Sequence, residues 1–402
     1  MPIRRICLFV SLFFFLANQV SAGVLVSHKE LKGRFMMSRK SVEFALKTLD
    51  PNAPKHTGDY HIKSFQLIYK TTSPKGKPVE ASALVVIRSD IFSERKKPRS
   101  WFHYSHGARF ESETSPSTLA YDPEALGARV FLAREGHLVL LPDYLGLGVN
   151  GTELQSYLNA KQQAQTSWDA LLALKEWSEE IELPQAERLI LGGYSQGGFV
   201  TLALQRKMQL ENLDIGSRLV ASFPMAGPYN FSGFSEDKLL EDAHPQLYGF
   251  IAFMIISLSQ DPRYSDIDLY ETVAEPFHPI LEKVLKKEMS LLEFTAEAAK
   301  VRYDFYTEDF LDTVNDESHP IFKAVSDQNL TKDWVPKVPT IFMAARDDEI
   351  IPYKITEKTY IRFNDNGAEH IEFIELPKGL GHVDAIHPAM ILLRDQAERF
   401  LK

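Results

Sequence analysis

The segment GYSQGG, residues 193–198, places Ser195 between glycines, directly after an apolar run and before an apolar helical pattern. A sharp turn from strand to helix lifts a serine off the end of a sheet, and small residues at Gly193 and Gly197 let strand and helix approach without Cβ clashes. Ser195 is therefore the candidate nucleophile. The competing interpretation is an ordinary glycine-rich turn between a strand and a helix, which doubly wound sheets often contain.

A serine hydroxyl is a weak nucleophile near neutral pH, so it needs a histidine base, and the base needs a carboxylate that fixes its tautomer. Asp348 lies in an acidic loop after the apolar run at 338–345, and His382 ends a glycine-bearing loop after the run at 371–376. The order serine, acid, histidine is the order that a strand-turn-helix serine motif of this kind uses. Asp347 competes with Asp348 for the role of the acid.

Acyl transfer also needs two hydrogen-bond donors aimed at the developing oxyanion. One is the backbone N–H after the nucleophile, which belongs to Gln196. The other is expected in the loop after the strand WFHYS, where His106 and Gly107 lead to the backbone N–H of Ala108. We expect His106 to be a supporting structural residue, and the competing interpretation of this segment is a simple glycine turn that ends a strand.

A further turn follows the apolar run HLVLLP at residues 137–142, where Asp143 precedes a glycine-rich segment. An aspartate in this position usually caps backbone N–H groups. We expect Asp143 to brace the oxyanion loop from below and to take no direct part in catalysis.

Short apolar runs alternate with helical patterns from about residue 60 onward, which is typical of an α/β fold. The runs at 61–70 and 80–88 alternate with period two, as antiparallel strands at a sheet edge do. Almost continuously apolar runs predict parallel strands in the sheet centre, at 137–142, 188–193, 218–226 and 338–345. Helices are expected at 123–135, 156–180, 197–211 and about 385–401.

More than a hundred residues, 228–334, lie between two of the central strands, and their periodicity is mostly helical. We interpret them as a helical cap inserted into the α/β core, which leaves 23–227 and 335–402 as its two parts. The run YGFIAFMIISL at 248–258 is almost wholly apolar, but eleven residues suit a buried helix better than a membrane span.

The first 22 residues have the pattern of a secretion signal, with a basic start at Arg4 and Arg5, an apolar run at 6–17 and small residues at 20–22. Export is therefore expected, with Gly23 as the first mature residue. An uncleaved membrane anchor is the alternative, but twelve apolar residues are short for a span.

Cys7 is the single cysteine and lies inside the signal, so the mature chain has no disulfide and no thiol nucleophile. An exported chain of this size without cysteine favours a periplasmic or secreted protein of bacterial origin.

The composition, 44% hydrophobic and 25% charged, is that of a soluble globular protein. Loss of the signal would change the net charge from −9 to −11, which argues against nucleic acid as a partner. The chain has no H-E-x-x-H motif, so neither a metal nor another cofactor is expected. The oligomeric state is left open.

The five segments HG at 106, PDYLGLG at 142, GYSQGG at 193, DDEIIPY at 347 and GLGH at 379 resemble the α/β-hydrolase superfamily. The pairing of PDYLGLG with GYSQGG is similar to bacterial and fungal secretory lipases and esterases. The resemblance covers residues 60–402 and implies Ser195 as nucleophile, Asp348 as acid and His382 as base. It also implies the two oxyanion donors given above and an apolar cap that favours lipophilic acyl groups.

The sequence therefore predicts a secreted serine hydrolase that cleaves carboxylic esters, of small molecules or lipids, through an acyl-enzyme on Ser195. A serine peptidase of the same fold would use the same side chains and is the first alternative. A noncatalytic binding module is the second, because a fold does not by itself imply activity.

Overall fold

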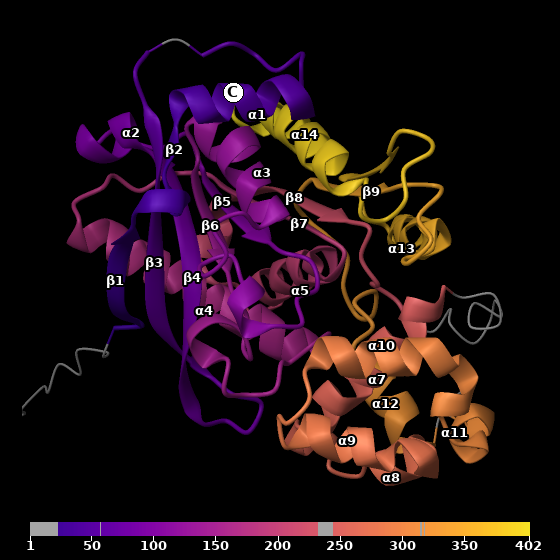
Figure 1. Cartoon of the computed structure of the whole chain (residues 1–402). Coiled ribbons are helices and arrows are strands. Elements are labelled where there is room, and N and C mark those ends of the chain that lie inside the picture. The colour runs from indigo at the N-terminus through magenta and orange to yellow at the C-terminus, as the bar shows by residue number, and fades with distance from the viewer. Residues whose placement is uncertain (1–22, 57, 232–243, 314–315, 317) are drawn as a thin grey trace, which may run out of the picture.

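The computed structural model describes residues 23–56, 58–231, 244–313, 316 and 318–402 (Figure 1). The predicted signal peptide at 1–22 lies outside the described residues, and so do residues 232–243 of the predicted cap.

A ten-stranded mixed sheet forms the centre of the molecule, in the order β1-β3-β4-β6-β5-β7-β8-β9-β10, with β2 pairing to β3. The pairs from β1 to β6 are antiparallel, and those from β6 to β10 are parallel. The strands are β1 Leu25–Leu31, β2 Met37–Ser38, β3 His61–Thr72, β4 Pro78–Arg88, β5 Trp101–Ser105, β6 Leu138–Pro142, β7 Leu189–Tyr194, β8 Leu219–Met225, β9 Thr340–Ala344 and β10 Ile371–Glu375.

The parallel half of the sheet positions the candidate site, because parallel strands end at the same edge. The loops after β5, β7, β9 and β10 therefore meet there, and these are the loops in which the sequence places the nucleophile, the acid, the base and an oxyanion donor. The strands β5, β6, β7 and β9 are buried along their whole length, as nearly continuous apolar runs predict.

The predicted α/β fold with a mostly parallel central sheet is confirmed, and one detail of the sheet edge is wrong. The runs at 61–70 and 80–88 are antiparallel strands, β3 and β4, but they lie inside the sheet. The edge strand is β1, whose side chains are intermediate or exposed throughout. A strand that buries so little has no strong apolar alternation, so its sequence carried no signal.

Helices cover both faces of the sheet. One apolar cluster joins α1, α3 and α14 to one face, and another joins α4 and α5 to the opposite face. The helices are α1 Arg39–Leu49, α2 Ser89–Ser93, α3 Pro123–Gly127, α4 Ala160–Glu180, α5 Gln196–Leu210, α7 Pro245–Ser259, α8 Leu269–Thr272, α9 His278–Leu285, α10 Leu291–Val301, α11 Glu308–Thr313, α12 Pro320–Ser326, α13 Tyr353–Asp365 and α14 Ile386–Ala397.

The four predicted helices are present, with shifted ends. The predicted helix at 123–135 is α3 followed by a π-helical turn at 128–132 and a 3₁₀ turn at 133–135. The predicted helix at 156–180 begins only at Ala160, where Asn159 accepts a hydrogen bond from the N–H of Gln162 and caps the helix. The helices α1, α2 and α13 were not predicted from the sequence.

The described residues between β8 and β9 are mostly helical, from α7 to α12, and Figure 1 shows these orange helices gathered beside the sheet. Its apolar side chains join a cluster that continues into the start of α5 through Phe199 and Val200. The expected buried helix at 248–258 is α7, and most of its side chains are buried. No helix in the described chain combines the length and apolarity that crossing a membrane requires.

The first prediction concerns the ion pair that ties α14 to the end of α1. Arg394 Nη1 lies 2.7 Å from Asp50 Oδ2, with side chains 6% and 10% exposed. Arg394→Met leaves a buried carboxylate without its partner, so we expect the free energy of unfolding to fall by about 3 kcal/mol in urea denaturation. Arg399→Met breaks a half-exposed pair with Glu372 and should cost less than about 1 kcal/mol. Equal losses would show that burial of the Arg394 pair carries no additional stability.

Candidate active site

Ser195 lies on a sharp turn between β7 and α5, with φ 58° and ψ −124°. A non-glycine residue rarely adopts a positive φ, so this backbone is strained and must be held by its surroundings. The N–H of Ser195 donates to the carbonyl of Met225 at 2.9 Å, and the carbonyl of Ser195 accepts from the N–H of Gly198, also at 2.9 Å. These bonds fix the turn from both sides.

The glycines of the turn are required by close backbone contacts. A Cβ on Gly197 would overlap the backbone of Ser105 at the end of β5, and a Cβ on Gly193 would overlap the carbonyl groups of Gly197 and Ser105. The first turn of α5 therefore lies directly against β5 with no side chain between them. This is the local reason for the spacing of glycines around Ser195.

Ser195, His382 and Asp348 form a continuous hydrogen-bonded series. Ser195 Oγ lies 2.8 Å from His382 Nε2, and His382 Nδ1 lies 2.7 Å from Asp348 Oδ2. The carboxylate accepts from Nδ1–H, which leaves Nε2 as the acceptor for the serine hydroxyl. Asp348 Oδ1 also accepts the N–H groups of Ile350 at 3.0 Å and Ile351 at 2.8 Å, so the carboxylate is held in one orientation.

The two competing aspartates bind different atoms of the histidine loop. Asp347 Oδ2 accepts the N–H of Gly379 at 2.8 Å and does not reach the imidazole, whereas Asp348 does. The neighbouring Glu349 accepts the backbone N–H of His382 at 3.0 Å. Three consecutive acidic residues therefore hold one loop at three positions.

Glu349 is a site residue that the sequence reading missed, although its position next to Asp348 is a usable signal. Burial acts to raise the pKa of Glu349, but hydrogen bonds from its own N–H and that of His382 and the nearby imidazole together hold it below its usual range. The loop has a second anchor, because the hydroxyl of Tyr194, which precedes Ser195, donates to the carbonyl of His382 at 2.9 Å.

The two expected oxyanion donors lie beside Ser195. Gln196 is the first residue of α5, and a Cβ on Gly107 would stand 3.7 Å from the Cβ of Ser195. Within the described part of the chain, neither the N–H of Ala108 nor that of Gln196 meets a hydrogen-bond acceptor. Both are thus available to a ligand at Ser195.

His106 is fully buried and stacks on Tyr144, with ring centroids 4.2 Å apart. Burial lowers its pKa to about 4, with a further contribution from the charge of Arg109. The imidazole is therefore neutral at neutral pH. Its Nδ1 lies 2.7 Å from the carbonyl oxygen of Gly107, so it acts on the conformation of the loop.

Asp143 does not brace the oxyanion loop in the way the sequence suggested. Its Oδ2 accepts the hydroxyl groups of Ser82 and Ser117, both at 2.5 Å, and its Oδ1 accepts the N–H of Ser117 at 2.9 Å. The side chain thus joins the turn after β6 to β4 and to the segment around Ser117. The N–H of Gly107 donates instead to Glu124 Oε2, at 2.8 Å.

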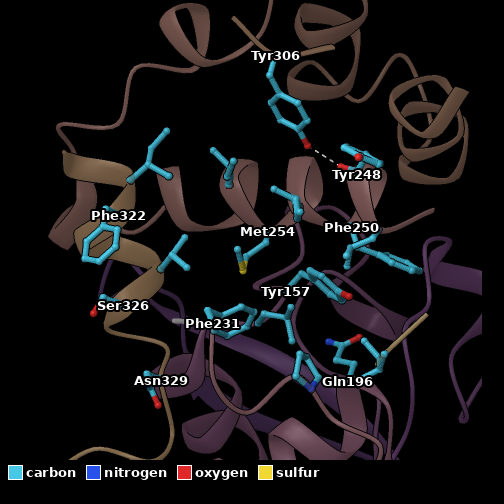
Figure 2. A pocket seen from close by; sticks show the side chains of 18 of the residues that line it. Tyr157, Gln196, Phe231, Tyr248, Phe250, Met254, Tyr306, Phe322, Ser326 and Asn329 are labelled. Atoms are coloured by element: carbon cyan, nitrogen blue, oxygen red, sulfur yellow. Dashed lines mark hydrogen bonds between the residues drawn. The ribbon is translucent and has the colours of Figure 1, made fainter. Parts of the chain in front are cut away.

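A predominantly apolar pocket opens at Ser195 and Gln196 (Figure 2). It holds about 1300 Å³ of space free of protein atoms, part of which is open solvent. Figure 2 shows Phe231 and Met254 between Gln196 and Phe322, which lies on the other side of the pocket. The residues from α7, α11 and α12 that line it are Leu247, Tyr248, Phe250, Ile251, Met254, Ile255, Phe310, Leu311, Ile321, Phe322, Val325 and Ser326.

The helical segment between β8 and β9 therefore lines the pocket in addition to packing in the apolar cluster that it shares with α5. Tyr306 shows how the two roles combine, because its hydroxyl donates to the carbonyl of Tyr248 at 2.6 Å while its ring lines the pocket. Among the described residues that line the pocket, none is acidic. The described residues also contain no group of three or more His, Cys, Asp or Glu side chains placed to hold a metal ion.

A family model described as secretory lipase matches residues 109–387. The secreted triacylglycerol lipase LIP3 of Malassezia restricta is 23% identical over 82% of this chain and 70% of its own length.

Two solved structures cover nearly the whole molecule. A Legionella pneumophila protein provisionally described as a hydrolase is 24% identical, with a TM-score of 0.82 over 94% of this chain and 98% of its own. The rice cell wall degrading esterase LipA of Xanthomonas oryzae, in a ligand-bound form, is 20% identical, with a TM-score of 0.78 over 94% and 99%. At these identities the likeness shows the fold, which is the predicted α/β-hydrolase fold.

The second prediction tests the contact between α5 and β5. In Gly197→Ala the new methyl group overlaps the backbone of Ser105, so we expect a loss of about 2 kcal/mol or more in the free energy of unfolding. Gly216→Ala is the matched control, because its Cβ would meet its nearest neighbour at an ordinary 3.5 Å and its φ is not positive. Thermal unfolding followed by circular dichroism compares the two, and equal stability would show that the close approach is dispensable.

Proposed function

Because this chain belongs to the secretory lipase family, we propose that it is a serine hydrolase that cleaves carboxylic esters through an acyl-enzyme on Ser195. The observation that carries the proposal is the hydrogen-bonded series of Ser195, His382 and Asp348 beside a predominantly apolar pocket that Ser195 lines. Ester hydrolysis requires both a nucleophile hydrogen-bonded to a base and a pocket beside it that admits the substrate.

In the proposed reaction, Ser195 Oγ attacks the ester carbonyl while His382 Nε2 takes the hydroxyl proton. Asp348 holds Nδ1–H and stabilises the imidazolium that forms. The negative charge on the carbonyl oxygen is met by the N–H groups of Ala108 and Gln196. Collapse of the tetrahedral intermediate breaks the C–O bond, and His382 returns its proton to the leaving alcohol.

Deacylation repeats these steps with water as the nucleophile. His382 takes a proton from the water as it attacks the acyl carbonyl, and the same two N–H groups stabilise the second intermediate. When that intermediate collapses, Ser195 leaves with the proton from His382. The carboxylic acid is released and the side chains return to their first state.

The lining of the pocket supports lipophilic acyl groups as substrates. An apolar chain gains about 0.8 kcal/mol for each methylene that it removes from water, so an apolar wall beside Ser195 favours longer acyl groups. The proposal places the acyl chain between α7 and α12, with Met254 and Phe231 on its path (Figure 2).

Export is part of the proposal and rests on the signal pattern at residues 1–22 and on the secreted relative from Malassezia restricta. The choice between periplasm and medium, and a bacterial origin, stay predictions from the sequence.

The two alternatives find less support. A peptidase that anchors the amino terminus of its substrate needs an acidic group near the nucleophile, and the described pocket residues include none. A noncatalytic module has no need for a serine hydroxyl bonded to an imidazole. Neither alternative is favoured by a specific observation.

The third prediction is hydrolysis of p-nitrophenyl esters by the mature protein, residues 23–402, with p-nitrophenyl acetate, butyrate and palmitate as substrates. Ser195→Ala and His382→Ala should each lower kcat by about 10⁶-fold, and Asp348→Asn by about 10⁴-fold. Asp347→Asn is the matched control and should keep kcat within about threefold, because Asp347 bonds the loop at Gly379 and not the imidazole.

An aminoacyl-p-nitroanilide and a fluorophosphonate complete the test. Labelling of Ser195 without turnover of any ester would overturn the ester assignment, and cleavage of the anilide in preference to esters would support the peptidase. Absence of both labelling and turnover in the folded protein would support the noncatalytic module.

The fourth prediction tests the path of the acyl chain with two changes at one position. Met254→Trp narrows the pocket and should lower the ratio of kcat/KM for palmitate to that for butyrate by about tenfold, since an excluded methylene segment loses its burial. Met254→Ala widens the pocket and should not lower that ratio. Activity on acetate should stay within about threefold in both variants. Equal loss on all three esters would place the acyl chain elsewhere.

A further inference from the structure

Side chains hydrogen-bond to several backbone polar groups of the loop after β5, residues 106–109. The carbonyl of His106 accepts the hydroxyl of Tyr144 at 3.0 Å. The N–H of Gly107 donates to Glu124 Oε2 at 2.8 Å, and the carbonyl of Gly107 lies 2.7 Å from His106 Nδ1. The carbonyl of Ala108 accepts Arg109 Nη1 at 2.9 Å. Among the described residues, the N–H of Ala108 meets no hydrogen-bond acceptor.

The orientation of that donor follows from its own peptide unit. In a trans peptide the carbonyl and the N–H point in opposite directions. The carbonyl of Gly107 points to His106, and since a carbonyl only accepts, His106 Nδ1 carries the proton. The N–H of Ala108 therefore points away from His106. The N–H of Gly107 is engaged by Glu124, so it is excluded as an oxyanion donor.

One carboxylate oxygen binds the residues on both sides of Ala108. Glu124 Oε2 accepts the N–H of Gly107 at 2.8 Å and Arg109 Nη2 at 2.7 Å, while Oε1 accepts the hydroxyl of Tyr104 at 3.0 Å. Glu124 is only 1% exposed. A Cβ on Gly107 would stand 3.4 Å from Glu124 Oε2 and 3.7 Å from the Cβ of Ser195, so Gly107 lies close to both the carboxylate and the nucleophile.

The Arg109 guanidinium, which donates a hydrogen bond to Glu124, favours the charged form of this carboxylate. Burial raises the pKa of Glu124, and the Arg109 guanidinium opposes that effect. Arg109 also contacts Asp122 Oδ2 at 2.6 Å, and Asp122 caps α3 by accepting the N–H of Ala125. The loop is thereby joined to the start of the helix that carries Glu124.

We propose that Glu124, with Arg109, is a positioning residue that sets the Ala108 N–H as the oxyanion donor opposite Gln196. This inference rests on the proposed function. Glu124 touches neither the nucleophile nor, in the proposed reaction, the substrate, and it acts by holding the peptide groups on both sides of Ala108.

The test compares Glu124→Met, which removes the acceptor, with Glu124→Gln, which keeps an oxygen for Gly107 and presents an amide to Tyr104. Glu124→Met should lower kcat for p-nitrophenyl butyrate by 10- to 100-fold with KM within about twofold, since the loss of one oxyanion donor costs 10²- to 10³-fold. Glu124→Gln should recover kcat to within about tenfold of the unmodified protein.

A second readout reports the oxyanion donors without ester turnover. An alkyl trifluoromethyl ketone adds to the serine and places an oxyanion in the same site, so its inhibition constant should rise in proportion to the fall in kcat/KM. An aliphatic alcohol of equal chain length, which occupies the pocket without forming an oxyanion, should bind all variants alike. A merely structural role for Glu124 would not separate these two ligands.

Two further variants keep the proposal falsifiable if Glu124→Met does not fold. Arg109→Met removes the less buried partner of the ion pair with Glu124 and should lower kcat three- to tenfold. The inhibition constant of the ketone should rise in proportion to the fall in kcat/KM. Asp169→Asn is the matched control, a buried carboxylate on α4 that bonds Thr71 and Gln165 and should leave kcat unchanged. Unchanged kcat and ketone affinity in folded Arg109→Met or Glu124→Met would overturn the proposal. Lack of turnover in the unmodified protein would instead reject the proposed function.

Discussion

The contact on which the site depends is the direct approach of the first turn of α5 to the end of β5. Gly197 lies against the backbone of Ser105, and this leaves Ser195 with a φ of 58° at the edge of the sheet. A non-glycine residue in such a conformation costs of the order of 1–3 kcal/mol. Hydrogen bonds of Ser195 to Met225 and Gly198 offset part of that cost, and the burial of β5 and β7 on both faces leaves the turn no room to relax. The strain aims the hydroxyl at His382.

The same contact explains which parts of the site were visible in the sequence. A turn with no room for side chains requires glycines at fixed spacing, so a local sequence pattern indicates Ser195 as the candidate nucleophile. The order of the segments along the chain and the positions of the strand ends indicate His382 as the candidate base. The sequence favours Asp348 as the acid but leaves Asp347 as a competitor, because both follow the same strand. Both bind the histidine loop, one at its imidazole and one at a backbone N–H.

The residues that the sequence reading missed act through contacts between segments that share no pattern. Glu124 lies at the start of a helix 17 residues after Gly107 and accepts its N–H, and no residue spacing in the sequence predicts that contact. The edge strand β1 buries little, so it carries no apolar alternation. In the helical segment between β8 and β9, apolar side chains serve either the core or the pocket wall, and periodicity does not distinguish the two.

Both sides of Ser195 are held by carboxylates that accept backbone N–H groups, but the two sides differ electrostatically. On the histidine side, hydrogen bonds and the nearby imidazole outweigh burial and hold the pKa of Glu349 below its usual range. On the oxyanion side, burial outweighs the attraction of Arg109 and raises the pKa of Glu124. The charged form of Glu124 is therefore less favoured than that of Glu349. Arg109 is the cation that favours the charged form of Glu124. An uncharged residue at position 109 would keep the loop sequence HGA but weaken the group that orients it. We therefore expect the identity of this residue to affect the proposed reaction, although it lies outside the hydrogen-bonded series of Ser195, His382 and Asp348.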